Sequence, residues 1–158
     1  MAFPLTFVPK ESWHVRPRSF GAPRDGGRRK HAGCDLYAPV GTPIFAVADG
    51  TVTQFREFYL GTFALVVDHG DLIVRYGEVQ KGLAKGVKVG GKVKKGQRIA
   101  SVGKLTGLDI SMIHFEMFTG KGRGELTQPR GKFRRRSDLM NPTEQLDTWA
   151  KEPLPKEE

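Results

Sequence analysis

The chain has 158 residues, the size of one compact domain with short tails. Its 26 Lys and Arg residues outnumber its 17 Asp and Glu residues, which gives a net charge of +9. The hydrophobic fraction of 38% argues against a disordered chain. The longest uncharged stretch near the start, residues 36–48, is too short and too interrupted by proline to cross a bilayer. A folded domain without a membrane span is therefore expected.

The positive charge is gathered in two blocks. Residues 81–104 hold eight Lys or Arg residues and no acid, and residues 121–136 carry a net charge of +6. Such surfaces attract polyanions, which include nucleic acids and bacterial wall polymers. Solvated lysines on a surface hairpin would explain the first block equally well. Phe133 is the one aromatic residue within the two blocks, so stacking on bases is poorly supported and no specific nucleic-acid partner is expected.

The chain starts with an irregular segment rich in Pro, Arg and Gly that extends to about residue 29 and is expected to lie over a sheet. Residues 1–18 of it are assigned to an N-terminal arm. Short apolar runs rich in Val, Ile, Phe and Thr then alternate with Gly and Pro, which predicts a mainly β protein. The predicted strands are residues 44–48, 50–58, 63–69, 72–76, 98–102 and 112–118. The turn signal His69-Gly70-Asp71 predicts an antiparallel hairpin across residues 63–76.

One short helix is expected near the C-terminus. Asn141 is a good N-cap, Pro142 suits the first helical position, and Glu144 follows the cap by three residues, so the helix should run to about Trp149. The main domain is predicted to cover residues 19–150, and residues 151–158 form a charged tail. No internal repeat or coiled-coil pattern is found.

Three residues suggest a metal site. His31-Ala-Gly-Cys-Asp35 separates an imidazole and a carboxylate by four positions around a glycine, so both side chains can reach one ion. This spacing is weak evidence alone. In the strand predicted around His114, alternation sends Met112, His114 and Glu116 to one face, which is not an ordinary amphipathic pattern. Taken singly, each candidate ligand could equally be a surface residue or a hydrogen-bonded core residue.

The segment that starts at His31-Ala-Gly-Cys-Asp35 and continues to Val52 resembles the signature of the lysostaphin-type (LytM-type) zinc metallopeptidases, which cut peptide bonds in bacterial peptidoglycan. Further blocks agree with that family in order. They are Ser19-Phe-Gly-Ala-Pro-Arg24, Val67-Asp-His-Gly70, Val74-Arg-Tyr76, Gly96-Gln-Arg-Ile-Ala-Ser-Val-Gly103, Ile113-His-Phe-Glu116 and Asp138-Leu-Met-Asn-Pro142. The resemblance covers about residues 19–146.

The resemblance implies a twisted, mostly antiparallel sheet with a groove along it, of the duplicated-hybrid-motif type. It also implies that His31, Asp35 and His114 bind one zinc ion per chain. Two His and one Asp leave a fourth coordination position open, as a catalytic zinc requires. Bound zinc would lower the pKa of its water to about 7 and polarise the scissile carbonyl.

Two positions depart from the family pattern. Met112 and Glu78 stand where the family usually has histidines that assist catalysis. Met112 has no proton to give, whereas the Glu78 carboxylate can act as the general base. Alternation places Tyr76 on the same face as Glu78, where its hydroxyl is expected to donate to the oxyanion. Arg24, Arg75 and Met112 are further candidates for lining the substrate groove.

The remaining histidines and the one cysteine are interpreted as structural. His69 lies at the hairpin turn, and His14 follows Trp13 in the arm. Cys34 lies between two predicted ligands, but if Asp35 points to the metal in an extended segment, Cys34 points into the core. A single cysteine makes no internal disulfide, which fits synthesis in a reducing compartment.

The expected function is that of an antibacterial cell-wall endopeptidase that hydrolyses peptidoglycan. The alternative is an inactive LytM-like domain that binds wall peptides or activates another hydrolase. The N-terminal residues lack the features of a secretory signal, so a protein made in the cytoplasm and delivered to the periplasm or wall by another route is expected. The expected partner is an immunity or carrier protein, and a monomer is expected.

Overall fold

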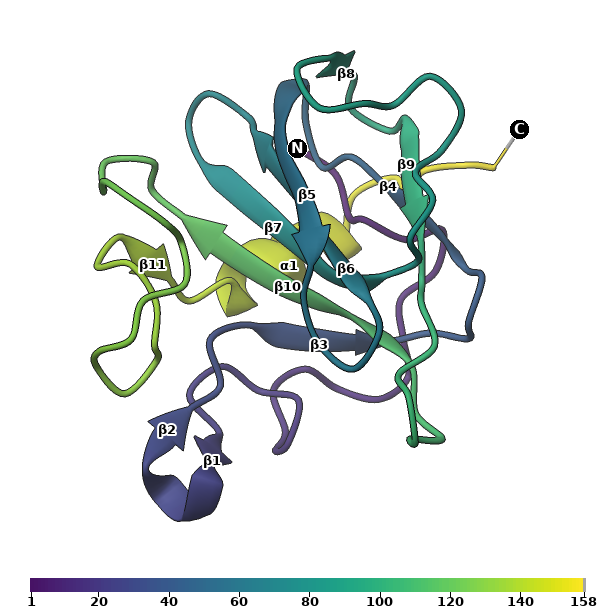
Figure 1. The fold of residues 1–158 in the computed structure, drawn as a ribbon. Helices are drawn as coiled ribbons and strands as arrows, with labels where there is room; N and C mark the ends of the chain where they lie inside the picture. The colour runs from purple at the N-terminus through teal and green to yellow at the C-terminus, as the bar shows by residue number, and fades with distance from the viewer. Residues whose placement is uncertain (158) are drawn as a thin grey trace.

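A twisted antiparallel sheet of seven strands forms the centre of the computed structural model, which describes residues 1–157 (Figure 1). The strand order is β11-β10-β7-β6-β5-β8, and β3 also pairs with β10. Two smaller sheets pair β1 with β2 and β4 with β9. The strands are β1 (Pro23–Arg24), β2 (Arg29–Lys30), β3 (Cys34–Tyr37), β4 (Pro43–Phe45), β5 (Gly50–Glu57), β6 (Phe63–Asp68), β7 (Ile73–Val79), β8 (Lys92–Val93), β9 (Arg98–Ser101), β10 (Met112–Phe118) and β11 (Leu139–Met140). The predicted mainly antiparallel β fold is therefore confirmed.

The six predicted strands are present with small shifts at their ends. The hairpin predicted across residues 63–76 is the pair β6 and β7, joined near His69. The strand predicted over 44–48 is shorter, because β4 ends at Phe45 after a register shift against β9. Strand β3 was not predicted as a strand. Three of its four residues are buried, so it lacks the alternation that identifies a half-exposed strand.

The hydrophobic core lies between one face of the sheet and helix α1 (Thr143–Ala150), which runs behind β7 and β10 in Figure 1. Phe115 of β10 meets Trp149 of the helix edge-on, with ring centroids 6.2 Å apart. The helix starts one residue later than predicted. Asn141 still caps it, because its Oδ1 accepts hydrogen bonds from the backbone N–H and the hydroxyl of Thr143.

The first residues of the chain join this core. Phe3, Leu5 and Trp13 are buried in it, and the backbone N–H of Ala2 donates to the carbonyl of Val47. A short 3-10 helix, η1 (Asp25–Gly27), connects β1 to β2. Within residues 1–157, no helix is both long and apolar enough to cross a membrane.

Candidate metal centre and groove

The sheet register brings the predicted metal ligands together. Asp35 of β3 lies directly opposite His114 of β10 in the antiparallel ladder. His31 precedes β3, and the chain between them passes close to β10. A side chain at Gly33 would collide with the carbonyl of Phe115, so glycine permits this approach. The chain between His31 and Asp35 thus turns so that the His31 side chain reaches Asp35 and His114.

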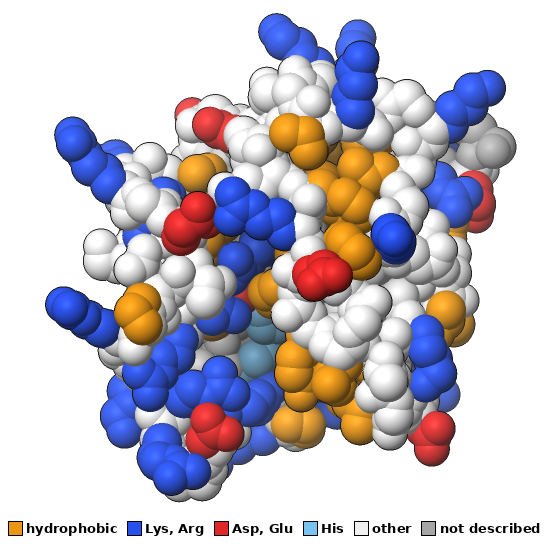
Figure 2. Space-filling model, in the orientation of Figure 1, with side chains coloured by type: hydrophobic (Ala, Val, Ile, Leu, Met, Phe, Trp, Pro, Cys, Tyr) orange, Lys and Arg blue, Asp and Glu red, His pale blue; other side chains and the backbone are white. Residues whose placement is uncertain are grey.

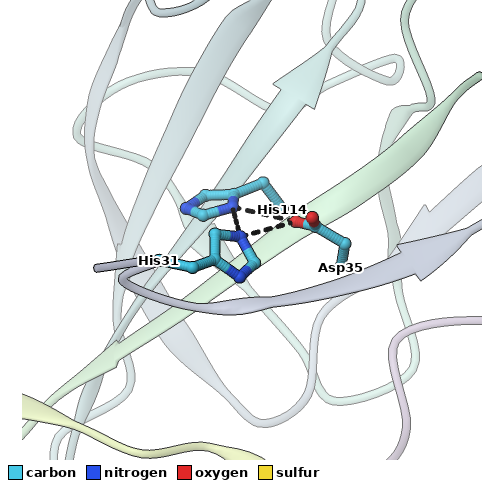
Figure 3. Close-up of side chains that lie close together, drawn as sticks. All are labelled: His31, Asp35 and His114. Carbon is cyan, nitrogen blue, oxygen red and sulfur yellow. Dashed lines mark hydrogen bonds and ion pairs between the residues drawn. The ribbon is translucent and has the colours of Figure 1, made fainter. Parts of the chain in front are cut away.

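Three donor atoms converge at this point, as Figure 3 shows. His31 Nε2 lies 3.1 Å from Asp35 Oδ1 and 3.1 Å from His114 Nδ1, and His114 Nδ1 lies 3.0 Å from Asp35 Oδ1. All three residues are buried. The sequence-predicted ligands therefore form one compact cluster.

Each imidazole ring has one nitrogen that points away from the cluster. The hydrogen bond at that nitrogen determines whether the nitrogen inside the cluster carries a lone pair. The carbonyl of Ser19 accepts from His31 Nδ1 at 2.9 Å, and a carboxylate oxygen of Glu116 accepts from His114 Nε2 at 2.6 Å. These bonds favour the tautomers in which His31 Nε2 and His114 Nδ1 are unprotonated. Two imidazole lone pairs and a carboxylate oxygen then face one another. A cation satisfies this arrangement, so the cluster is a metal site.

Protonation equilibria of the metal-free cluster reflect the same negative potential. Burial alone would raise the pKa of Asp35, but hydrogen bonds from His114 and His31 lower it to about 2. Burial would lower the pKa of His114, but its bonds to Asp35 and Glu116 raise it to about 10. The site therefore binds positive charge, which in the absence of metal is a proton.

Glu116 also contacts the metal cluster, although it was not among the residues predicted for the site. Its side chain is fully buried beside His114 and accepts hydrogen bonds from Arg75 and Arg135. Burial would raise the pKa of Glu116, but Arg75 and the hydrogen bond from His114 hold it well below its usual range. The signal was the alternation that places Glu116 on the face of His114. Arg135, from the second basic block, carried no such signal.

Glu78 reaches the groove through a β-bulge in β7. Leu65 pairs with Tyr76 but Phe63 pairs with Val79, so β7 has one extra residue over this stretch. Glu78 lies in this bulge and has a left-handed backbone conformation with a φ of 65°. The residue is 7% exposed and lines the groove, and its Oε2 is the one buried side-chain N or O atom without a hydrogen-bond partner among residues 1–157. Burial raises the pKa of Glu78 to about 7.

The expectation that Tyr76 shares a face with Glu78 is wrong. The bulge after Tyr76 breaks the alternation on which the expectation was based. The Tyr76 ring is fully buried in the core against Phe115, and its hydroxyl contacts His69 Nε2 at 2.9 Å and accepts from the Val47 backbone N–H. Burial also raises the pKa of Tyr76 above its usual value. This hydroxyl is therefore not placed to donate to an oxyanion in the groove.

The structural assignments of His69 and Cys34 agree with these contacts. His69 joins Tyr76 to the carbonyl of Asp49 and has no place in the metal cluster. Cys34 is buried in the core, where its sulfur lies 3.6 Å from the Thr143 hydroxyl. Burial raises the pKa of the Cys34 thiol to about 11, so it is neither a ready nucleophile nor a thiolate ligand.

The cluster opens into a groove of about 870 Å³. Figure 2 shows histidine at the bottom of a hollow, with Lys and Arg side chains along one wall and hydrophobic side chains along the other. Arg24, Arg75 and Met112, the predicted groove candidates, all line it. The side of the metal cluster that faces the groove can therefore meet water and a substrate.

A β scaffold with a buried His-Asp-His cluster at the floor of a groove defines a protein with a metal site that is open to a substrate. The model of peptidase family M23 matches residues 29–128. The chain belongs to peptidase family M23, and the predicted lysostaphin-type resemblance is confirmed.

Individual relatives agree with this assignment. The peptidoglycan DD-endopeptidase ShyC of Vibrio cholerae is 34% identical over 115 residues, which are 72% of this chain and 25% of ShyC. The chain therefore spans about a quarter of that relative's length.

Solved structures give the fold and a metal-bearing comparison. The catalytic domain of lysostaphin from Staphylococcus simulans superposes with a TM-score of 0.60 at 23% identity, over 81% of this chain and 88% of that one. A zinc-containing peptidase from Vibrio cholerae superposes with a TM-score of 0.56 at 29% identity, over 74% of this chain and 36% of that one. The lysostaphin-like fold is confirmed.

Proposed function

We propose that this protein is a zinc-dependent endopeptidase that hydrolyses peptide bonds in bacterial peptidoglycan. The observation that carries the proposal is the convergence of three metal-binding lone pairs, from His31, Asp35 and His114, at the floor of a groove that also contains Glu78. Family membership and the peptidoglycan endopeptidase activity of ShyC support the choice of substrate.

The donor set fits zinc. Two imidazole nitrogens and one carboxylate oxygen are ligands typical of catalytic zinc, and three protein ligands leave a fourth position open. Calcium and magnesium prefer oxygen ligands alone. When bound there, zinc supplies a water ligand with a pKa of about 7 and a Lewis acid that polarises the scissile carbonyl.

Glu78 is the general base of the proposed reaction. Its unpartnered Oε2 can accept the proton of the attacking water, hold it, and pass it to the leaving amine. A pKa near 7 suits both halves of this transfer at neutral pH. Its backbone conformation costs about 1–3 kcal/mol in a residue other than glycine, a cost that is common at functional sites.

Met112 favours a second candidate function. It lines the groove without a proton to donate, at a position where the family resemblance implies a catalytic histidine. If Glu78 cannot substitute for the missing histidines, the chain is a wall-binding or hydrolase-activating domain. The intact ligand cluster supports the enzyme, because an inert scaffold does not require an open metal site.

Peptide release from purified sacculi tests the proposal. We expect the Glu78→Gln variant to bind zinc as the wild type does and to lose roughly a hundredfold or more of the release rate, because Gln cannot accept the proton. Glu152→Gln, an exposed substitution in the C-terminal tail, is the control and should leave the rate unchanged. Full activity in a zinc-loaded Glu78→Gln variant would exclude Glu78 as the base.

The site of action and the partners belong to the same proposal. A monomer that acts in the periplasm or the extracellular wall after non-classical delivery, with an immunity or carrier protein as partner, accords with the substrate. The basic blocks 81–104 and 121–136 would hold it to the anionic wall.

A further inference from the structure

Two arginines share a single carboxylate next to the metal cluster. Arg75 donates through Nε and Nη2 to Glu116 Oε1 at 3.1 and 2.9 Å. Arg135 donates through Nε and Nη2 to Glu116 Oε2 at 3.0 and 2.9 Å. The tautomer of His114 that leaves Nδ1 free for a metal is neutral. The group formed by Arg75, Glu116 and Arg135, the Arg-Glu-Arg cluster, therefore carries one uncompensated positive charge.

This charge is held in a nearly buried place. The side chain of Glu116 is fully buried, and those of Arg75 and Arg135 are 8% and 13% exposed. A charge removed from water needs a partner of opposite sign, and a metal ion bound beside His114 makes the local potential still more positive. The cluster therefore favours a second anion.

The cluster also has free hydrogen-bond donors that face the groove. Among residues 1–157, Nη1 of Arg75 donates to no acceptor. This atom is not fully buried, because the one fully buried side-chain N or O atom without a partner is Glu78 Oε2. Arg75 lies over the ring of Phe58, with its guanidinium carbon 5.0 Å from the ring centroid, which fixes its orientation. Both arginines line the groove. Nη1 of Arg135 already donates to the Arg134 carbonyl at 3.1 Å. An anion in the groove can therefore bind to the unused N–H groups of Arg75, with the charge of Arg135 beside them.

Two other arginines of the groove already have carboxylate partners. Arg56 is paired with Glu125 at 2.9 Å, and Arg29 is paired with Asp25 at 2.6 Å. Both pairs are largely exposed, so water screens them as well. Lys30 also lines the groove and has no carboxylate partner among residues 1–157, but it is exposed to water. The buried, uncompensated positive charge of the groove therefore lies at Arg75 and Arg135.

We propose that Arg75 and Arg135 bind a carboxylate of the substrate beside the scissile bond, an inference that rests on the proposed function. The substrate class is then a wall peptide that retains free carboxylates near the bond that is cut. Neutral glycine bridges and stem peptides with amidated carboxylates are the poorer substrates. A carboxylate on oriented guanidinium N–H groups accepts with two oxygens and carries the opposite charge, whereas a carboxamide offers one acceptor oxygen and no charge.

The test compares two soluble crosslinked wall-peptide dimers that differ only in their carboxylates, which are free in one and converted to carboxamides in the other. We expect the zinc-loaded wild type to have a kcat/KM about tenfold or more higher for the free-acid dimer. Arg135→Gln should bring this ratio close to one, and Arg135→Lys should retain part of it. Arg98→Gln, which removes one exposed cation outside the groove, should leave the ratio unchanged.

Zinc content is measured in every variant, because Glu116 also contacts His114. Equal wild-type rates on the two dimers would overturn the subsite and leave the proposed function intact. An equal loss on both dimers in zinc-loaded Arg135→Gln would show a structural role instead and would also overturn it. If the zinc-loaded wild type cleaves neither dimer, the proposed function fails, and calorimetric affinities of the two dimers for wild type and Arg135→Gln decide the subsite separately.

Discussion

At the scale of single residues, sequence motifs predicted the metal ligands but not the groups around them. His31 and Asp35 are four positions apart, so their proximity is local, and the family resemblance added His114. Glu116 supports His114 from the same strand face and was foreseeable by alternation. Arg135 could not be predicted, because its contact with Glu116 depends on the path of a loop 19 residues further along the chain.

The burial of Glu78 predicts a stability that depends on pH. Its pKa is raised to about 7, so the folded protein keeps a proton between about pH 4.5 and 7 that the unfolded chain releases. The metal-free protein therefore loses stability as pH rises through this range, by about 3 kcal/mol. Metal-free Glu78→Gln should be about 2–3 kcal/mol more stable than the wild type at pH 8 and nearly equal to it at pH 4.

Urea unfolding of the metal-free proteins at the two pH values measures this difference. Glu152→Gln, an exposed substitution, should show none. A Glu78→Gln variant as stable as the wild type at pH 8 would mean that the buried Glu78 carboxylate does not lower the free energy of unfolding.

At the scale of elements, the bulge in β7 is the feature that regular strand patterns do not reveal. Alternation predicted the strand, and extending the same alternation to Glu78 placed Tyr76 and Glu78 on one face of the sheet. The bulge puts them on opposite faces instead. Strand β3 was missed for a related reason, because most of its residues are buried and no alternating pattern remains. Strands with one exposed face, such as β5, were predictable.

The loop before Leu105 holds the bulge in place, which gives a prediction for Gly103. Its N–H donates to the carbonyl of Glu78 at 2.9 Å, and a Cβ there would lie 2.9 Å from the carbonyl atoms of Val79. Gly103→Ala must therefore displace the backbone of the bulge. We expect a loss of about 1–3 kcal/mol in unfolding free energy and a lower kcat with zinc still bound.

Thermal unfolding, zinc content and peptide release are measured on the same samples. Gly82→Ala is the matched control, since a Cβ at that glycine meets nothing within 4 Å. Unchanged release by Gly103→Ala would show that the bulge does not set the position of the Glu78 carboxylate.

At the scale of the whole molecule, the mainly β fold was predictable and the packing of its ends was not. The family blocks and the β-rich composition predicted one antiparallel sheet with a groove and a short final helix. The burial of Phe3 and Trp13 could not be inferred, because the N-terminal segment has no periodicity that identifies a buried face. The net charge of +9 appears in the structure partly as a wall of cations beside the histidines.

The most direct test of the central claim is a zinc titration of peptide release from purified sacculi. Protein stripped with a chelator is expected to release nothing, and release should rise with added zinc until one ion is bound per chain, because one cluster supplies the ligands. Product masses then identify the bond that is cut. Release that persists after complete removal of metal, or no release from the fully zinc-loaded protein, would contradict the account.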